Sequence, residues 1–80
     1  MRKRLSFKDK HALETLPARM EKLGAEIAAQ RKKLADPALF GRDPAAFNKG
    51  AAQLAGLEAE LAAAEDDWLR LELLREDVEG

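Results

Sequence analysis

Two apolar series with helical spacing, separated by a turn-like segment, constrain the fold of this chain more than any other feature. The first series precedes the segment Asp36–Pro44 and consists of Leu13, Leu16, Met20, Leu23, Ile27 and Leu34. The second follows it and consists of Leu54, Leu57, Leu61, Ala64, Trp68 and Leu71. Apolar residues at this spacing form a narrow stripe on a helix, and two such stripes joined by a turn bury each other. The sequence therefore predicts an all-α fold, an antiparallel two-helix coiled-coil hairpin.

Capping residues and prolines predict where the helices begin and end. Ser6, with an acid three residues later, is typical of a helix start. Pro17 disfavours helical backbone in the residue before it, so we expect a kink or a break there and a short extra N-terminal helix. Asp43 and Pro44 suit the cap and first position of the last helix. We expect a tail or linker end at 1–5 and one domain at 6–80, with helices at about 7–15, 17–35 and 44–77.

The register of the hairpin can also be predicted. We prefer the antiparallel register in which large side chains of one helix pack against small ones of the other. The predicted pairs are Leu34 with Gly50, Ile27 with Leu57, Leu23 with Leu61, Met20 with Ala64, Leu16 with Trp68, and Leu13 with Leu71. Gln30 is a polar residue at a seam position, where a single such residue often fixes register. Trp68 has the spacing of its apolar neighbours, so we expect it in the seam rather than on the surface.

Composition excludes several classes of function. The 80 residues include no Cys and only His11 as a histidine, so neither a disulfide nor a thiolate metal site can form. There is no glycine-rich phosphate loop and no plausible nucleophile set. We therefore predict no catalytic, cofactor-binding or metal-binding residues in this chain. The absence of a long apolar run and of a signal-peptide core predicts a cytoplasmic protein without membrane contact.

Charge is distributed unevenly along the chain. Residues 1–43 hold 11 Lys/Arg and 6 Asp/Glu, whereas residues 44–80 hold 3 and 9. One interpretation is that the basic and acidic arms attract each other and select their pairing. The other is that the basic arm also binds phosphate groups.

The basic residues fall into two main groups, both candidates for binding nucleic acid. The group near the turn, which only Asp36 and Asp43 oppose, is Arg31, Lys32, Lys33, Arg42 and Lys49. The N-terminal group, which the register sets beside Glu72, Glu76, Asp77 and Glu79, is Arg2, Lys3, Arg4, Lys8 and Lys10. Arg19 and Lys22 lie between them. The group near the turn is the less neutralised and hence the better candidate.

Aromatic residues are not expected to be exposed in either group. Leu39, Phe40 and Phe47 are predicted to form a small apolar cluster that fixes the turn. Binding should therefore be directed to the nucleic-acid backbone and depend little on base sequence.

Four short motifs occur in an order that resembles a known family. They are Leu5-Ser6-Phe7-Lys8-Asp9, Leu13-Glu14-Thr15-Leu16-Pro17-Ala18-Arg19-Met20-Glu21, Leu34-Ala35-Asp36-Pro37-Ala38-Leu39-Phe40 and Glu65-Asp66-Asp67-Trp68-Leu69-Arg70-Leu71-Glu72. Together they resemble the C-terminal domain of ABC-F ATPases of the Uup type. Met20 and Phe40 stand where the family pattern usually has Ile and Tyr. Asp66-Asp67 replaces a common Glu-Arg, which removes one basic residue.

The resemblance implies that this chain is part of a larger protein. Tandem ATP-binding cassettes would lie upstream, bind ATP and magnesium and contact this domain, and the parent would be an ATPase. In this family the C-terminal domain is a coiled-coil hairpin reported to bind DNA, and relatives act on the ribosome. Similar hairpins end some aminoacyl-tRNA synthetases, notably the valyl enzyme, and contact tRNA.

Two classes of function therefore stay open. One is a nucleic-acid-binding module, whose target could be DNA, ribosomal RNA or transfer RNA. The other is a protein-interaction or spacer hairpin without a nucleic-acid role. The sequence does not fix the oligomeric state.

Overall fold

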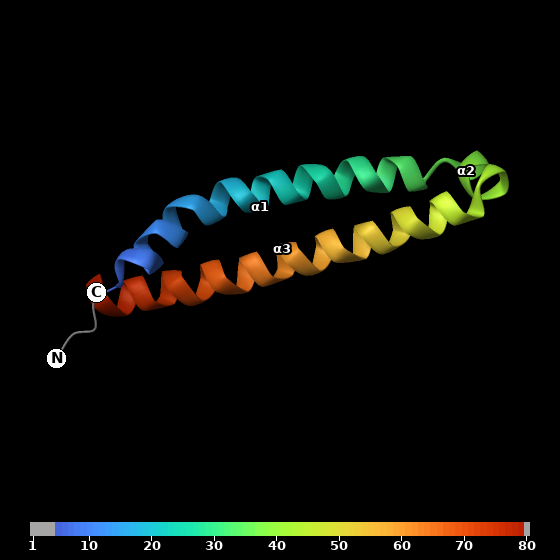
Figure 1. Cartoon of the computed structure of the whole chain (residues 1–80). Coiled ribbons are helices and arrows are strands. Elements are labelled where there is room, and N and C mark those ends of the chain that lie inside the picture. Colours follow the sequence, from blue (N-terminus) through green and yellow to red (C-terminus); the bar gives the residue numbers. More distant parts are fainter. Residues whose placement is uncertain (1–4, 80) are drawn as a thin grey trace.

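The structure, a computed structural model, is a long helical hairpin. It describes the backbone of residues 5–79 and the side chains of residues 5–77. These residues form α1 (Phe7–Leu34), α2 (Pro37–Arg42) and α3 (Pro44–Glu79). α1 and α3 run antiparallel along a body whose Cα atoms extend over 62 × 17 × 15 Å, and α2 closes one end (Figure 1). We call the α2 end the tip and the opposite end the open end. The predicted all-α hairpin is confirmed.

Each helix begins at a side chain that accepts a backbone hydrogen bond. The backbone N–H of Asp9 donates to Ser6 Oγ at 3.1 Å, as the sequence predicts. At the tip, the N–H of Ala38 donates to Asp36 Oδ1 at 3.0 Å, and the N–H of Ala46 donates to Asp43 Oδ1 at 3.1 Å. These bonds satisfy donors that have no partner inside the helix. Asp36 and Asp43 thereby bracket the six-residue α2, which the sequence analysis assigned to the turn.

The predicted interruption of the first helix at Pro17 is wrong. The expected helices at 7–15 and 17–35 are one continuous helix, so the short additional helix of this fold lies at the tip. Pro17 is exposed, whereas Leu16 and Met20 beside it are half-buried on the inner side of α1. Packing of that inner side keeps the helix continuous, although Pro17 lacks the N–H for one backbone hydrogen bond. α1 bends over its first turns, which lean towards α3 (Figure 1), as expected near a proline.

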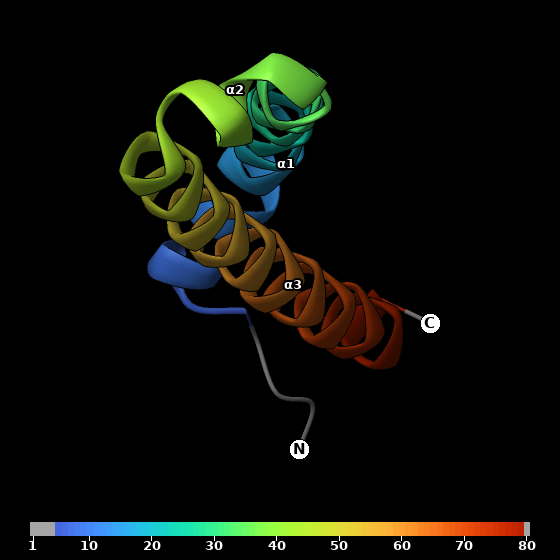
Figure 2. The ribbon, with the colours of Figure 1, turned by 90° about the vertical axis from the view of Figure 1, so that its right-hand side faces the viewer.

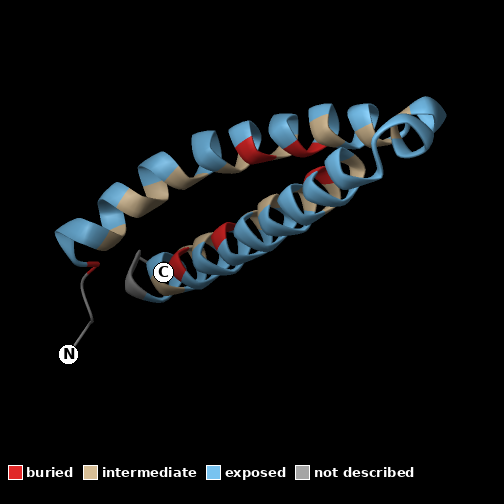
Figure 3. Ribbon diagram, turned by 45° about the vertical axis from the view of Figure 1, so that its right-hand side comes forward, coloured by how far each residue is buried: buried red, intermediate tan, exposed pale blue. Residues whose placement is uncertain are grey.

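The core is a single seam between α1 and α3. Its most deeply buried side chains are Leu23, Ile27, Ala64 and Leu71, and these positions lie on the facing sides of the two helices (Figure 3). Leu5 is buried as well, so the prediction that it belongs to a tail is wrong. Most other seam residues are only half-buried, because a hairpin covers just one side of each helix. The two helices cross at an angle when viewed from the tip (Figure 2).

Contacts near the tip fix the register of the seam. A Cβ atom at Gly50 would lie 3.0 Å from Leu34 Cδ2, so the predicted Leu34–Gly50 layer is confirmed. Gln30 Nε2 donates a hydrogen bond to the carbonyl oxygen of Gly50 at 3.0 Å and lies 3.3 Å from Gln53 Oε1. A side chain of α1 therefore binds the backbone of α3 at Gly50, where the two helices lie close together.

The hollows along the body agree with this register at Leu23 and Met20, whereas the Ile27–Leu57 and Leu13–Leu71 layers stay predictions. Leu23 and Glu60 line one surface hollow, and Met20 lines another with Leu61 and the half-buried Trp68. The direct contact of Leu16 with Trp68 stays a prediction.

The three glycines of the two long helices provide a test of the close approach at Gly50. We expect Gly24→Ala and Gly56→Ala each to raise the free energy of unfolding by about 1 kcal/mol, because a new methyl group meets nothing within 4 Å and alanine favours the helix. Gly50→Ala should raise it less, since its methyl group lies 3.0 Å from both Gln30 Nε2 and Leu34 Cδ2. Chemical denaturation measures all three, and equal gains would mean that the helices do not meet at Gly50.

A charged residue introduced into the seam tests whether the seam is buried. Leu23 is 5% exposed, so Leu23→Asp should lower the free energy of unfolding by about 3 kcal/mol or more, because the carboxylate would be buried without a partner. Ala25→Asp, on the exposed side of the same helix, is the matched control and should cost about 1 kcal/mol or less. Similar thermal melts for the two variants would contradict the proposed core.

Candidate nucleic-acid interface

Four basic side chains from all three helices gather at the tip. Lys32 and Lys33 of α1 and Arg42 of α2 line one open hollow, and Lys33 also lines a second hollow with Lys49 of α3. Leu39 of α2 lines both hollows. We call Lys32, Lys33, Arg42 and Lys49 the basic tip. The turn thus joins residues that are up to 17 positions apart in the sequence.

The basic tip is weakly neutralised. All four side chains belong to exposed residues, and none forms an ion pair with another described residue. Asp36 lines one of the hollows, but its carboxylate and that of Asp43 accept the capping hydrogen bonds of α2 and α3. Their negative charge therefore also compensates the positive ends of two helices.

Arg31 differs from the other members of its predicted group. Its Nη2 lies 3.3 Å from Glu58 Oε2 of α3, so the prediction that only Asp36 and Asp43 oppose this group is wrong for Arg31. Both side chains are largely exposed, and an ion pair in such a position contributes between 0 and about 1 kcal/mol. Within residues 5–77 this is the one ion pair between α1 and α3. Direct pairing of the two arms is therefore sparse.

The N-terminal basic group is only partly described. Arg2, Lys3 and Arg4 lie outside the described residues. Lys8 and Lys10 are exposed, and neither forms an ion pair with a described acid.

The acids expected to neutralise this group behave differently. Glu72 pairs with Arg75 of its own helix, and the side chain of Glu79 is not described. Among residues 5–77, Lys8 and Lys10 therefore make none of the predicted direct contacts with these acids.

Arg19 and Lys22 lie midway along α1 in a more acidic environment. Both are exposed and line a hollow with Glu26 of the same helix and Glu60 of α3. The structure therefore separates them from the basic tip.

Charge changes sign along the axis of the hairpin. The tip segment, residues 29–53, contains five Lys/Arg and two Asp/Glu. The rest of the hairpin, residues 5–28 and 54–77, contains six Lys/Arg and twelve Asp/Glu. A polyanion is consequently attracted to the tip and repelled by the body of the hairpin.

An exposed aromatic side chain accompanies the basic tip, contrary to the sequence prediction. Phe40 packs edge to face on Phe47, with ring centroids 5.2 Å apart and planes at 85°, which confirms two members of the predicted apolar cluster. A contact of Leu39 with these rings stays a prediction. However, Phe40 remains 54% exposed. Leu39 and Phe40 are consecutive in α2, where neighbouring side chains point in different directions, and of the two only Leu39 lines the hollows. The sequence did not distinguish them, because both were assigned to a turn. Phe7 is likewise exposed at the open end.

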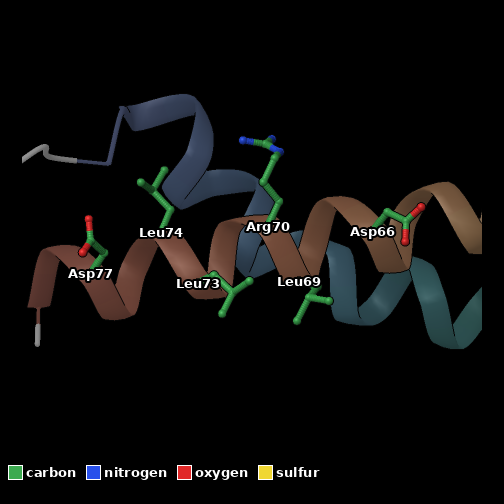
Figure 4. Close-up of a pocket in the computed structure, with 6 residues that line it drawn as sticks. All are labelled: Asp66, Leu69, Arg70, Leu73, Leu74 and Asp77. Carbon is green, nitrogen blue, oxygen red and sulfur yellow. The ribbon is translucent and has the colours of Figure 1, made fainter.

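A second feature that the sequence analysis missed is an apolar surface near the open end. Leu69 and Leu73 of α3 are more than half exposed and project side by side from one side of the helix (Figure 4). Asp66, Arg70 and Asp77 border them. The two leucines are four residues apart and lie outside the seam series, which is the pattern of a second apolar stripe. We call Leu69 and Leu73 the open-end patch.

The described residues show no other arrangement with obvious chemistry. In residues 5–77, no group of three His, Asp or Glu side chains is placed to bind a metal ion. None of the described helices is long and apolar enough to cross a bilayer.

Comparison with known proteins agrees with this geometry. The family model of the ABC transporter C-terminal domain matches residues 4–73. The ATP-binding protein Uup of Haemophilus influenzae is 36% identical over 77 residues, which cover 96% of this chain and 12% of that protein. The ATP-binding protein Uup of Escherichia coli is 35% identical over 72 residues, which cover 90% of this chain and 11% of that protein. No solved structure matches.

These relatives are much longer than the chain described. A Uup-like ATP-binding protein of Haemophilus influenzae is also similar, 34% identical over 77 residues, and the chain spans 17% of it. The match supports the first of the two family resemblances, not the synthetase hairpin. The chain belongs to the family of ABC transporter C-terminal domains, of the type found in Uup ATP-binding proteins.

Proposed function

We propose that this domain is a non-catalytic nucleic-acid-binding module of a larger ABC-F ATPase and that its basic tip binds phosphate groups. The parent would bind ATP and magnesium in cassettes outside this chain, and the hairpin would present the tip at a distance from them. The observation that carries the proposal is the convergence of four cations from three helices without ion-pair partners among the described residues.

The shape of the tip suits contact with a phosphate backbone. Exposed lysines around the two hollows act as mobile point charges, and Arg42 adds a planar donor group. Arg31 can join them, because its exposed pair with Glu58 is weak and phosphate is an alternative partner. Contacts of this kind position a nucleic acid without selecting its sequence. We therefore propose DNA or structured RNA as the ligand class.

A charge-reversal variant tests the basic tip. Changing Lys32, Lys33 and Lys49 to Glu should weaken binding to duplex DNA by about tenfold or more, similarly for unrelated sequences, because phosphate contacts are lost. The logarithm of affinity falls with that of salt concentration by about 0.9 for each phosphate neutralised, so the slope should also become shallower. Fluorescence anisotropy titrations of the chain at several salt concentrations measure both quantities.

A matched variant separates a local site from net charge. Changing Lys10, Arg19 and Lys22 to Glu alters the net charge equally but leaves the tip intact, so it should weaken binding much less. Equal losses in the two triple variants would contradict a site at the tip. Changing Arg2, Lys3 and Arg4 tests the N-terminal group in the same way, and a larger loss there would move the site to the open end.

A second candidate function, protein interaction, is favoured by the open-end patch. Leu69 and Leu73 form an apolar surface with acidic neighbours, on a domain whose relatives extend well beyond the matched region. We propose that the ATP-binding part of the parent protein covers this patch. This contact would hold one end of the hairpin while the tip stays free.

The patch can be tested in the parent protein. Leu69→Ser with Leu73→Ser should increase hydrogen exchange in the ATP-binding part that covers it, because the contact is lost. The exposed pair Ala59→Ser with Ala63→Ser is the control on the same helix. If hydrogen exchange outside the hairpin is the same in both double variants, the ATP-binding part does not cover the patch.

A further inference from the structure

Phe40 leaves an aromatic face open to solvent. In an edge-to-face pair, one ring presents its edge to a face of the other, so each ring retains at least one face that its partner does not cover. Phe40 is 54% exposed, and the half-buried Phe47 holds it from α3. Phe40 is therefore both oriented and accessible, unlike an aromatic residue on a mobile tail.

The surroundings of Phe40 are cationic. It shares the six-residue α2 with Arg42, and Leu39 beside it lines both hollows of the basic tip. Phe40 itself lines neither hollow, so its exposed ring and the cations are separate features of the same short segment. Proteins bind single-stranded nucleic acids by combining exposed aromatic rings, on which bases stack, with cations that bind the backbone. The bases of an intact duplex are already stacked on one another and present only their edges.

We propose that Phe40 stacks on an unpaired base and that the basic tip therefore prefers nucleic acid with single-stranded segments to uninterrupted duplex. This inference rests on the proposed function, since the cations of the tip supply the phosphate contacts. It adds a recognition element that is independent of charge. Arg42 and the lysines bind either form, whereas only an unpaired base can use the face of Phe40.

The test compares aromatic substitutions at the two ends of the hairpin. Phe40→Ala should weaken binding to a thymidine oligonucleotide at least about fivefold, the lower range for loss of one stacked base, and change binding to a blunt duplex of matched length less than about twofold. Phe7→Ala makes the same chemical change at the open end and should leave both affinities unchanged. A uridine oligonucleotide, run in parallel, shows whether RNA serves as well as DNA.

A purely structural role of Phe40 has a different signature. Phe40→Trp should keep the affinity for the thymidine oligonucleotide, because tryptophan also stacks, and its added fluorescence should be quenched on binding relative to the parent chain. If Phe40→Trp loses as much affinity as Phe40→Ala, or if Phe40→Ala weakens duplex binding equally, the side chain maintains the tip and the stacking proposal is wrong.

The outcomes distinguish this proposal from the proposed function. If Phe40→Ala binds single strands as tightly as the parent chain while the Lys32, Lys33 and Lys49 variant binds neither form well, phosphate binding stands and stacking fails. If the parent chain binds neither oligonucleotide nor duplex, both proposals fail together.

Discussion

The seam between α1 and α3 determines everything else in this structure, because the tip is assembled only in one register. Leu34 packs at Gly50, and Gln30 donates to the Gly50 carbonyl, at the end of the seam nearest α2. A slip of one helical turn would move Leu34 away from Gly50, which has no side chain. It would also separate Lys33 from Lys49, which now line one hollow. The positions of the charges are therefore a consequence of apolar packing and of one hydrogen bond across it.

The hairpin divides its surface chemistry between its two ends. The tip carries an excess of basic residues and the exposed ring of Phe40. The body carries an excess of acidic residues, and Leu69 and Leu73 are exposed near the open end. Such an arrangement attracts a polyanion end-on and disfavours its lying along the body. At the open end, an apolar patch suits contact with protein. The two proposals together make this body of 62 × 17 × 15 Å an arm with a different partner at each end.

The fold could be predicted from the sequence because its determinants are local and periodic. The seam spacing gave the hairpin, and Ser6, Asp43 and the glycine opposite Leu34 gave its caps and register. The helix break predicted at Pro17 was wrong, because a proline that faces solvent removes one backbone hydrogen bond while packing on the opposite side keeps the helix continuous. The exposure of Phe40 and the pairing of Arg31 with Glu58 were not predicted. Both depend on how α2 and the two long helices are placed in three dimensions, which residue types alone do not specify.

The most direct test of the account is a map of backbone amide NMR shifts as duplex or single-stranded DNA is added to the chain. Binding at the basic tip predicts the largest changes between Arg31 and Gly50, on both sides of α2, and little change between Ala64 and Asp77, where the surface is acidic. Unchanged amide shifts at the tip, together with changed shifts in residues 5–22, would contradict binding at the tip. In that case the convergence of cations at the tip would have no role in binding.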